Sequence, residues 1–534
     1  MARGQSLNLI KLQFTDEASC RHWIESLPLT NVQSAQRSLT LQLATLRQAG
    51  VAPSKLFRIL EILREPIHYV QGELARKYSA KPLPLDAGAT ALWTQAASLW
   101  QELVDCYLTC RDAHVHGDLP LRNCGAIIVM RALRYTGTLM FEHYRIYRQV
   151  PGHLWHDLHR LYVFAEESGF LRTPVVDSFS PDAPESNCGA AYCRALLAHM
   201  ANPFALSGRQ MEFVARWIEQ WSGLLSVASQ PLPSSAIPPL AVDVAASTGP
   251  FLLAGREASP SMRYLDVEAI GRSLRQTMTL LKQGHTPAQL GLGDDARQPG
   301  CENLVMLLYI QWCRAGTGRG EQRDTVTEKA QVCLGIHAAH FYISGRAFRM
   351  PGSSLTPEEE SDMQMFGHIS DRTEVMLASG QSAAVESWEL MNQSNSGFMC
   401  MLRDTDAETR IAHNQLVAVR RASNRHFNLG LVQWLRVEET EQLSVGVRLL
   451  PGVARAVVAR PANFIAPSGI NGCERALLLP EIVAPATPLS LILPTGWYQA
   501  GRFIDIFDER KHVARLGTLL EKGSDFDRCA VTFV

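Results

Sequence analysis

Two short polar motifs have residue types that could bind phosphate and a purine base. The first is an R-x-x-x-R formed by Arg319 and Arg323, and the second is an N-x-S-x-x-G formed by Asn392, Ser394 and Gly397. A guanidinium fork pairs bidentately with phosphate or with the O6/N7 edge of guanine, and it also stacks on bases. Asn and Ser bend the backbone through local hydrogen bonds, and Gly permits positive φ or close backbone approach. Together the motifs offer groups suited to a nucleotide.

Each motif stands at the edge of a predicted strand, and their order resembles that of the two signatures of the PilZ domain. PilZ is a small β-barrel that binds the bacterial second messenger cyclic di-GMP, and residues 315–460 resemble a divergent member of this family. The resemblance implies a receptor without catalytic residues, metal or other cofactor. The ligand-binding residues that it implies are Arg319, Arg323, Asn392, Ser394 and Gly397.

The region departs from the PilZ pattern in two places. Residues 345–384 separate the motifs, and Thr356 followed by Pro357 is typical of a helix start, so we expect a helical insertion there. A second R-x-x-x-R, formed by Arg421 and Arg425, follows the N-x-S-x-x-G motif in sequence. We interpret this second pair as part of a polar hairpin connection.

The elements ahead of the motifs are predicted to be helical. Between residues 54 and 78, apolar residues recur at spacings of three and four, which indicates one face of a long helix. These residues are Leu56, Leu60, Leu63, Ile67, Val70 and Leu74. We assign residues 1–228 to a helical region. Residues 229–314 are assigned to a linker with short strands, at 240–244 and 251–254, and further helices.

After Arg319 the apolar period changes to two. The run Ala330–Ser344 is expected to form the first barrel strand, and further strands are predicted at 416–419, 429–435, 443–450 and 453–460. We therefore assign 315–460 to a PilZ-like antiparallel β-barrel and 461–534 to a smaller β-rich module. The predicted fold class is multidomain α+β, with an all-α region followed by the barrel and this C-terminal module.

Composition restricts the function classes. The 534 residues are 46% hydrophobic and 19% charged, and the formal net charge is −1, which argues against a nucleic-acid partner bound over the whole surface. The twelve cysteines include no C-x-x-C pair, so reduced thiols in the cytoplasm are expected. The sequence contains no run of eighteen apolar residues, so neither an export signal nor a membrane span is predicted.

Three functions remain open from sequence. The leading hypothesis is a cytoplasmic cyclic di-GMP receptor that signals through an unidentified protein partner, with homo-oligomer formation left open. The alternative is a barrel that has lost its ligand and serves as an interaction scaffold. The third is a metal-dependent hydrolase on the helical region. It rests only on clustered metal-ligating residue types, which are His114, His116, Asp118, His153, His156 and His159.

Overall fold

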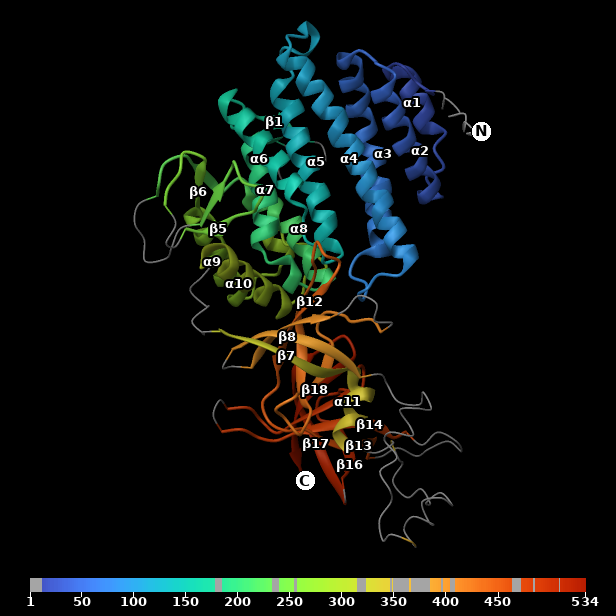
Figure 1. The fold of residues 1–534 in the computed structure, drawn as a ribbon, viewed down its shortest axis with the longest axis vertical. Coiled ribbons are helices and arrows are strands. Elements are labelled where there is room, and N and C mark those ends of the chain that lie inside the picture. Colours follow the sequence, from blue (N-terminus) through green and yellow to red (C-terminus); the bar gives the residue numbers. More distant parts are fainter. Residues whose placement is uncertain are drawn as a thin grey trace. The chain divides into compact units, whose positions relative to one another are not determined.

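The chain divides into two compact units. In the computed structural model the described residues are 12–177, 185–232, 240–253, 257–314, 323–345, 348, 365, 385–394, 397–403, 409–462, 472–483, 486–508 and 510–534. The units are Met1–Lys81 with Leu85–Gly320, and Pro82–Pro84 with Glu321–Val534. The first is mainly helical and the second is built from β-strands (Figure 1). This arrangement confirms the predicted α+β class.

Long helices with one apolar face form the first unit. The six apolar residues predicted to share a helix face are each at most 1% exposed. Helix α3 packs beside α4, and α4 beside α5 (Figure 1). The helices are α1 (Glu17–Glu25), α2 (Val32–Gln48), α3 (Pro53–Tyr78), α4 (Ala87–Val115), α5 (Gly125–Arg145), α6 (Gly152–Glu167), α7 (Cys188–Met200) and α8 (Gly208–Ser222). In the described ranges, no helix is long and apolar enough to cross a bilayer.

A small sheet and two further helices complete this unit. The sheet has the strand order β3-β6-β4-β5. The two strands predicted here are present as β4 and β5, and β3 and β6 were not predicted. The elements are β1 (Val175–Val176), β2 (Glu185–Ser186), β3 (Ser226–Ala228), β4 (Leu240–Asp243), β5 (Phe251–Leu252), β6 (Met262–Asp266), α9 (Glu268–Lys282) and α10 (Gly300–Cys313).

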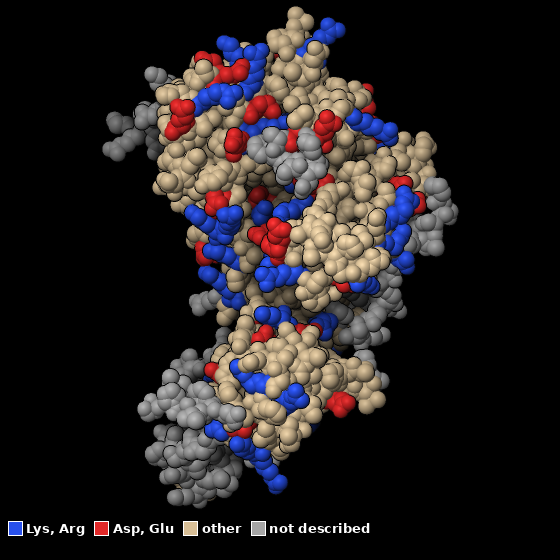
Figure 2. All heavy atoms as spheres, turned by 180° about the vertical axis from the view of Figure 1, so that it is seen from behind, with Lys and Arg blue, Asp and Glu red and all other residues tan. Residues whose placement is uncertain are grey.

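A buried charge cluster joins helices of the first unit. The fully buried Asp177 carboxylate forms ion pairs with Arg64 at 2.6 Å, Arg131 at 3.2 Å and Arg134 at 3.0 Å. Burial by itself would raise the pKa of Asp177, but the three guanidinium groups outweigh it and hold that pKa below its usual value. At the surface, acidic and basic side chains are interspersed (Figure 2), in keeping with the small net charge.

The second unit begins with a closed six-stranded barrel. Its order is β7-β8-β9-β12-β11-β10, and β10 pairs back with β7. The meander predicted between residues 416 and 450 is confirmed as β10, β11 and β12. The strands are β7 (Arg323–Leu334), β8 (Glu386–Ser394), β9 (Phe398–Arg403), β10 (Leu416–Arg421), β11 (Asn428–Val437) and β12 (Leu443–Leu449).

The apolar run Ala330–Ser344 is not one strand, which corrects the prediction. Strand β7 ends at Leu334, and α11 (Gly335–Ser344) follows, starting at a glycine whose φ is +83°. Ile336 and Ala339 of this helix are buried in an apolar cluster. A buried helix and a buried strand both give continuous apolar sequence, so periodicity could not separate them. The helical insertion predicted over 345–384 lies outside the described residues, apart from 345, 348 and 365.

A second closed barrel follows, with the order β13-β14-β15-β18-β17-β16. Residues 453–460 were predicted as a strand of the first barrel, but β13 pairs with β14 and β16. The first barrel already closes through β7 and β10, so it has no free edge for another strand. The strands are β13 (Arg455–Pro461), β14 (Glu474–Leu479), β15 (Ser490–Pro494), β16 (Phe503–Phe507), β17 (Lys511–Lys522) and β18 (Phe526–Phe533).

The two barrels share an apolar core. It contains Leu416 and Leu429 of the first barrel and Leu477 and Ile492 of the second, and α11 packs on β10, β13 and β14. Polar contacts add to it, because Oδ1 of Asp525, in the connection from β17 to β18, accepts the backbone N–H of Leu416 at 3.0 Å. The barrels therefore pack on each other as parts of one unit.

Candidate ligand-binding site

Arg323 of the first predicted motif and Asn392 and Ser394 of the second lie on neighbouring strands at one end of the first barrel. Arg323 is the first residue of β7 and stands directly opposite Ser394, the last residue of β8. In the same register, Thr325 stands opposite Asn392. Residues directly opposite each other in an antiparallel pair have Cα atoms about 4.5–5.5 Å apart. Strand pairing thus brings together positions that are far apart in sequence. Arg319 lies outside the described residues, and the structure describes only the backbone of Arg323.

Gly397 closes the turn after β8, and the backbone there requires glycine. Its φ is +83°, and its N–H donates to the carbonyl oxygen of Ser394 at 3.1 Å. The carbonyl oxygen of Gly397 accepts the N–H of Leu449 at 3.0 Å, which ties the turn to the end of β12. A Cβ at this position would lie 3.3 Å from Cβ of Leu449. Both positive φ and close approach, the two uses of glycine considered from sequence, occur here.

Asn392 and Ser394 differ in their surroundings. Ser394 is 4% exposed, and Asn392 is partly buried. The Oδ1 atom of Asn392 is buried and accepts no hydrogen bond from any described residue. Buried acceptors in proteins are nearly always satisfied, so an unsatisfied one calls for a donor from water or a ligand. The base edges and hydroxyl groups of a nucleotide carry such donors.

Arg421 belongs to this end of the barrel, contrary to its interpretation as part of a hairpin connection. It is the last residue of β10, and its Nε donates to Oε1 of Glu328 at 2.5 Å. Its Nη1 donates to Oε1 of Gln393 at 2.6 Å, and Gln393 lies between Asn392 and Ser394. Sequence order argued against Arg421, whereas barrel closure places β10 beside β7. The repeated R-x-x-x-R spacing was the signal that could have found it. Arg425 lies in the exposed connection after β10.

The histidine clusters do not form a metal site. Nδ1 of His114 lies 3.0 Å from the carbonyl oxygen of Leu121, and both ring nitrogens of the buried His159 lie 2.9 Å from oxygen partners. Within the described part of the chain, no group of three or more His, Cys, Asp or Glu side chains could hold a metal ion. These imidazoles take part in ordinary hydrogen bonds.

Comparisons with known proteins identify domains at both ends of the chain. Residues 18–232 match the family model described as "Cyclic-di-GMP receptor FimW, N-terminal domain", and residues 465–534 match "FimW C-terminal beta-barrel domain". A relative from Pseudomonas aeruginosa named "Cyclic-di-GMP receptor FimW" is 22% identical, over 91% of this chain and 85% of its own length. No solved structure matches the chain. The two matched ranges together cover more than half of the sequence, and they correspond to the N-terminal and C-terminal domains of the FimW models.

Proposed function

We propose that this chain is a cyclic di-GMP receptor whose ligand lies at the end of the first barrel. The observation that carries the proposal is the register of β7 and β8, in which the backbone of Arg323 lies opposite Ser394. Arg319 and Arg323 would bind phosphate or the guanine O6/N7 edge. Asn392, Ser394 and Gly397 would form the facing turn. The name of the P. aeruginosa relative supports the same ligand.

The receptor acts without catalysis in this proposal and signals through a protein partner. The first unit, which contains the FimW N-terminal domain, is the natural place for that partner to bind. The proposed compartment is the cytoplasm, because all twelve cysteines are free thiols and eight of them are buried.

A specific observation supports a second candidate, a barrel that serves as an interaction scaffold without ligand. The guanidinium of Arg421, near the turn, already donates hydrogen bonds to Glu328 and Gln393 of the same barrel. If the barrel is a scaffold, the polar contacts at its end stabilise the fold and bind no ligand. Affinity for cyclic di-GMP separates the two candidates.

The test is calorimetric titration of the full chain with cyclic di-GMP beside GTP. Arg323→Ala should weaken cyclic di-GMP binding by about 2–3 kcal/mol, because it removes a charge-assisted bidentate contact. Asn392→Ala should also weaken it, by about 1 kcal/mol for a single neutral hydrogen bond.

Two arginine variants serve as controls. Arg455 is the first residue of β13, the same place in the second barrel that Arg323 has in the first, and its side chain is 65% exposed. Arg455→Ala and Arg425→Ala should leave affinity unchanged. Unchanged affinity in Arg323→Ala and Asn392→Ala would reject this site. Absence of any cyclic di-GMP binding to the wild-type chain would favour the scaffold.

A further inference from the structure

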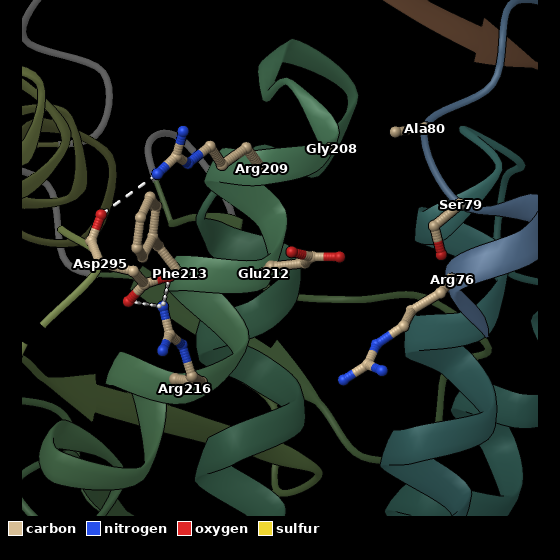
Figure 3. A pocket seen from close by; sticks show the side chains of 9 residues that line it. All are labelled: Arg76, Ser79, Ala80, Gly208, Arg209, Glu212, Phe213, Arg216 and Asp295. Carbon is tan, nitrogen blue, oxygen red and sulfur yellow. Dashed lines mark hydrogen bonds and ion pairs between the residues drawn. The ribbon is translucent and has the colours of Figure 1, made fainter. Parts of the chain in front are cut away.

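A surface pocket in the helical unit lies between the end of α3 and the start of α8. Its volume is about 400 Å³, within the range of small-molecule sites. Three arginines, two carboxylates and one phenylalanine are among the residues that line it (Figure 3). The lining residues are Arg76, Ser79, Ala80, Gly208, Arg209, Glu212, Phe213, Arg216 and Asp295. The pocket belongs wholly to the first unit and shares no residue with the barrel end.

The floor of the pocket is held by a close approach of the two helix ends. A Cβ on Gly208 would lie 1.9 Å from Cβ of Ala80, so only glycine allows this contact. The start of α8 is capped at Ser207, whose Oγ accepts the N–H of Gln210. The backbone N–H of Ala80 donates to the carbonyl oxygen of Arg145 at 3.3 Å. These contacts define the geometry of the pocket before any ligand binds.

One wall is a stack of guanidinium groups and an aromatic ring. The Cζ atoms of Arg216 and Arg209 lie 5.0 and 5.6 Å from the ring centroid of Phe213. Nη2 of Arg216 donates to both carboxylate oxygens of Asp295, at 2.9 and 3.0 Å, and Arg209 donates to the backbone carbonyl of Asp295 at 3.2 Å. Rings and guanidinium planes held in this way are surfaces on which nucleobases stack.

Glu212, on the same helix α8, presents a carboxylate to the hollow on the side of α3 (Figure 3). Figure 3 shows the side chains of Glu212 and Arg76 extending toward one another across it. Glu212 is exposed and forms no ion pair with any described residue. Arg76 pairs with Glu73 at 2.5 Å, but its side chain is 73% exposed, so the pair is weak and easily rearranged. The pocket thus offers the two carboxylate oxygens of Glu212 as acceptors beside the exposed guanidinium of Arg76.

This combination matches guanine better than adenine. Guanine carries N1–H and N2–H donors on one edge, which a carboxylate accepts, and O6 and N7 acceptors on another, which a guanidinium fork serves. Adenine has no N1–H, so it would leave Glu212 with a weaker partner. The exposed guanidinium of Arg76 can pair with a phosphate in place of Glu73.

We propose that this pocket binds the guanine base of a guanine nucleotide, with Glu212 on the N1–H/N2–H edge and the base face on Phe213 and Arg209. Arg76 meets the phosphate. Under the proposed receptor function, on which this identification of the nucleotide rests, cyclic di-GMP is that ligand. The pocket is then a second binding site, separate from the barrel end.

The test is titration of the full chain and its variants with cyclic di-GMP, cyclic di-AMP and GMP. Glu212→Gln and Phe213→Ala should each lower the affinity of the pocket for cyclic di-GMP about tenfold or more. This is the scale of a lost bidentate base contact. Glu212 is exposed, so Glu212→Gln should keep the melting temperature of the wild-type chain. Phe213→Ala also removes a ring that stacks on the buried Trp217, so its melting temperature is measured beside its affinity. Glu25→Gln, on a 75% exposed carboxylate of α1, is the matched control. Arg323→Ala should weaken binding at the barrel end alone and leave binding in the pocket unchanged.

The outcomes separate this proposal from the receptor function. Cyclic di-GMP binding that is unaffected by both pocket variants overturns the pocket and leaves the receptor standing. Equal binding of cyclic di-AMP at the site that the pocket variants affect also overturns it. If cyclic di-GMP does not bind at all, the receptor function fails. GMP binding that Glu212→Gln weakens would then still support the guanine pocket, and no GMP binding would reject it.

Discussion

The two barrels have the same strand order but different ends. Each strand of the first has a counterpart in the second, β7 with β13, β8 with β14 and onward, and both close in the same way. After β8 the first barrel carries the polar turn that ends at Gly397. At the corresponding end of β14 stand Leu479 and Pro480, and Leu479 is buried in the core between the barrels. The end of the second strand therefore carries polar groups in the first barrel, whereas in the second barrel the corresponding strand end packs in the core.

The barrels also differ in how they compensate a buried carboxylate. In the first, Glu386 is 14% exposed, and Arg403, itself 1% exposed, is its one cationic partner among the described residues. In the second, Asp505 is 1% exposed and has two partners, Arg460 at 2.8 Å and Lys511 at 3.1 Å. Burial acts to raise the pKa of both carboxyls, but hydrogen bonds from these cations outweigh it and lower the pKa of each.

The different number of cationic partners predicts the largest effect on the free energy of unfolding. Arg403→Ala removes the cationic partner of Glu386 inside the protein and should cost on the order of 3–5 kcal/mol in the free energy of unfolding. Arg460→Ala leaves Lys511 on Asp505 and removes a more exposed guanidinium, so it should cost about 1 kcal/mol or less. Chemical denaturation followed by circular dichroism measures both. Equal losses of unfolding free energy in the two variants would show that the number of cationic partners does not set the cost of removing one.

The contact between Asp525 of the second barrel and Leu416 of the first predicts a pH dependence of stability of intermediate size. Burial raises the pKa of Asp525 from 3.8 to about 6, so its stabilising contribution is present below about pH 4 and is lost as the pH rises through about 6. A shift of about two pKa units corresponds to about 3 kcal/mol.

The variant that tests this contact is Asp525→Asn. Asn keeps an acceptor for the N–H of Leu416 but does not ionise, so its stability relative to wild type should rise by up to about 3 kcal/mol between pH 4 and pH 7. Denaturation midpoints of both proteins at the two pH values give this difference. A relative stability that does not change with pH would contradict the raised pKa.

A pair of glycine variants gives the smallest predicted effect. Gly397 and Gly496 have φ of +83° and +87°, but only Gly397 has a side chain, Leu449, within 4 Å of the Cβ position. Gly496→Ala should cost about 1–2 kcal/mol for the left-handed backbone alone. Gly397→Ala should cost a few tenths of a kcal/mol more, since Leu449 must move. Melting temperatures measure the difference, and the opposite order would place the tighter turn in the second barrel.

What the sequence by itself determined was local. The three- and four-residue spacing of Leu56 to Leu74 predicted α3, and the period of two between residues 416 and 450 predicted three barrel strands, because such patterns depend only on near neighbours in the chain. The resemblance to PilZ implied one ligand site for both motifs; strand pairing places the backbone of Arg323 opposite Ser394, and Arg319 lies outside the described residues.

Only the tertiary structure decided the contacts between distant segments. It made Gly335–Ser344 a helix between the barrels, assigned β13 to the second barrel and placed Arg421 on Gln393. It also brought the end of α3 and the start of α8 together around a pocket that residue spacing in the sequence does not predict. Barrel closure and helix packing depend on which surfaces complement each other across long separations. That information is absent from the periodicity of any single segment.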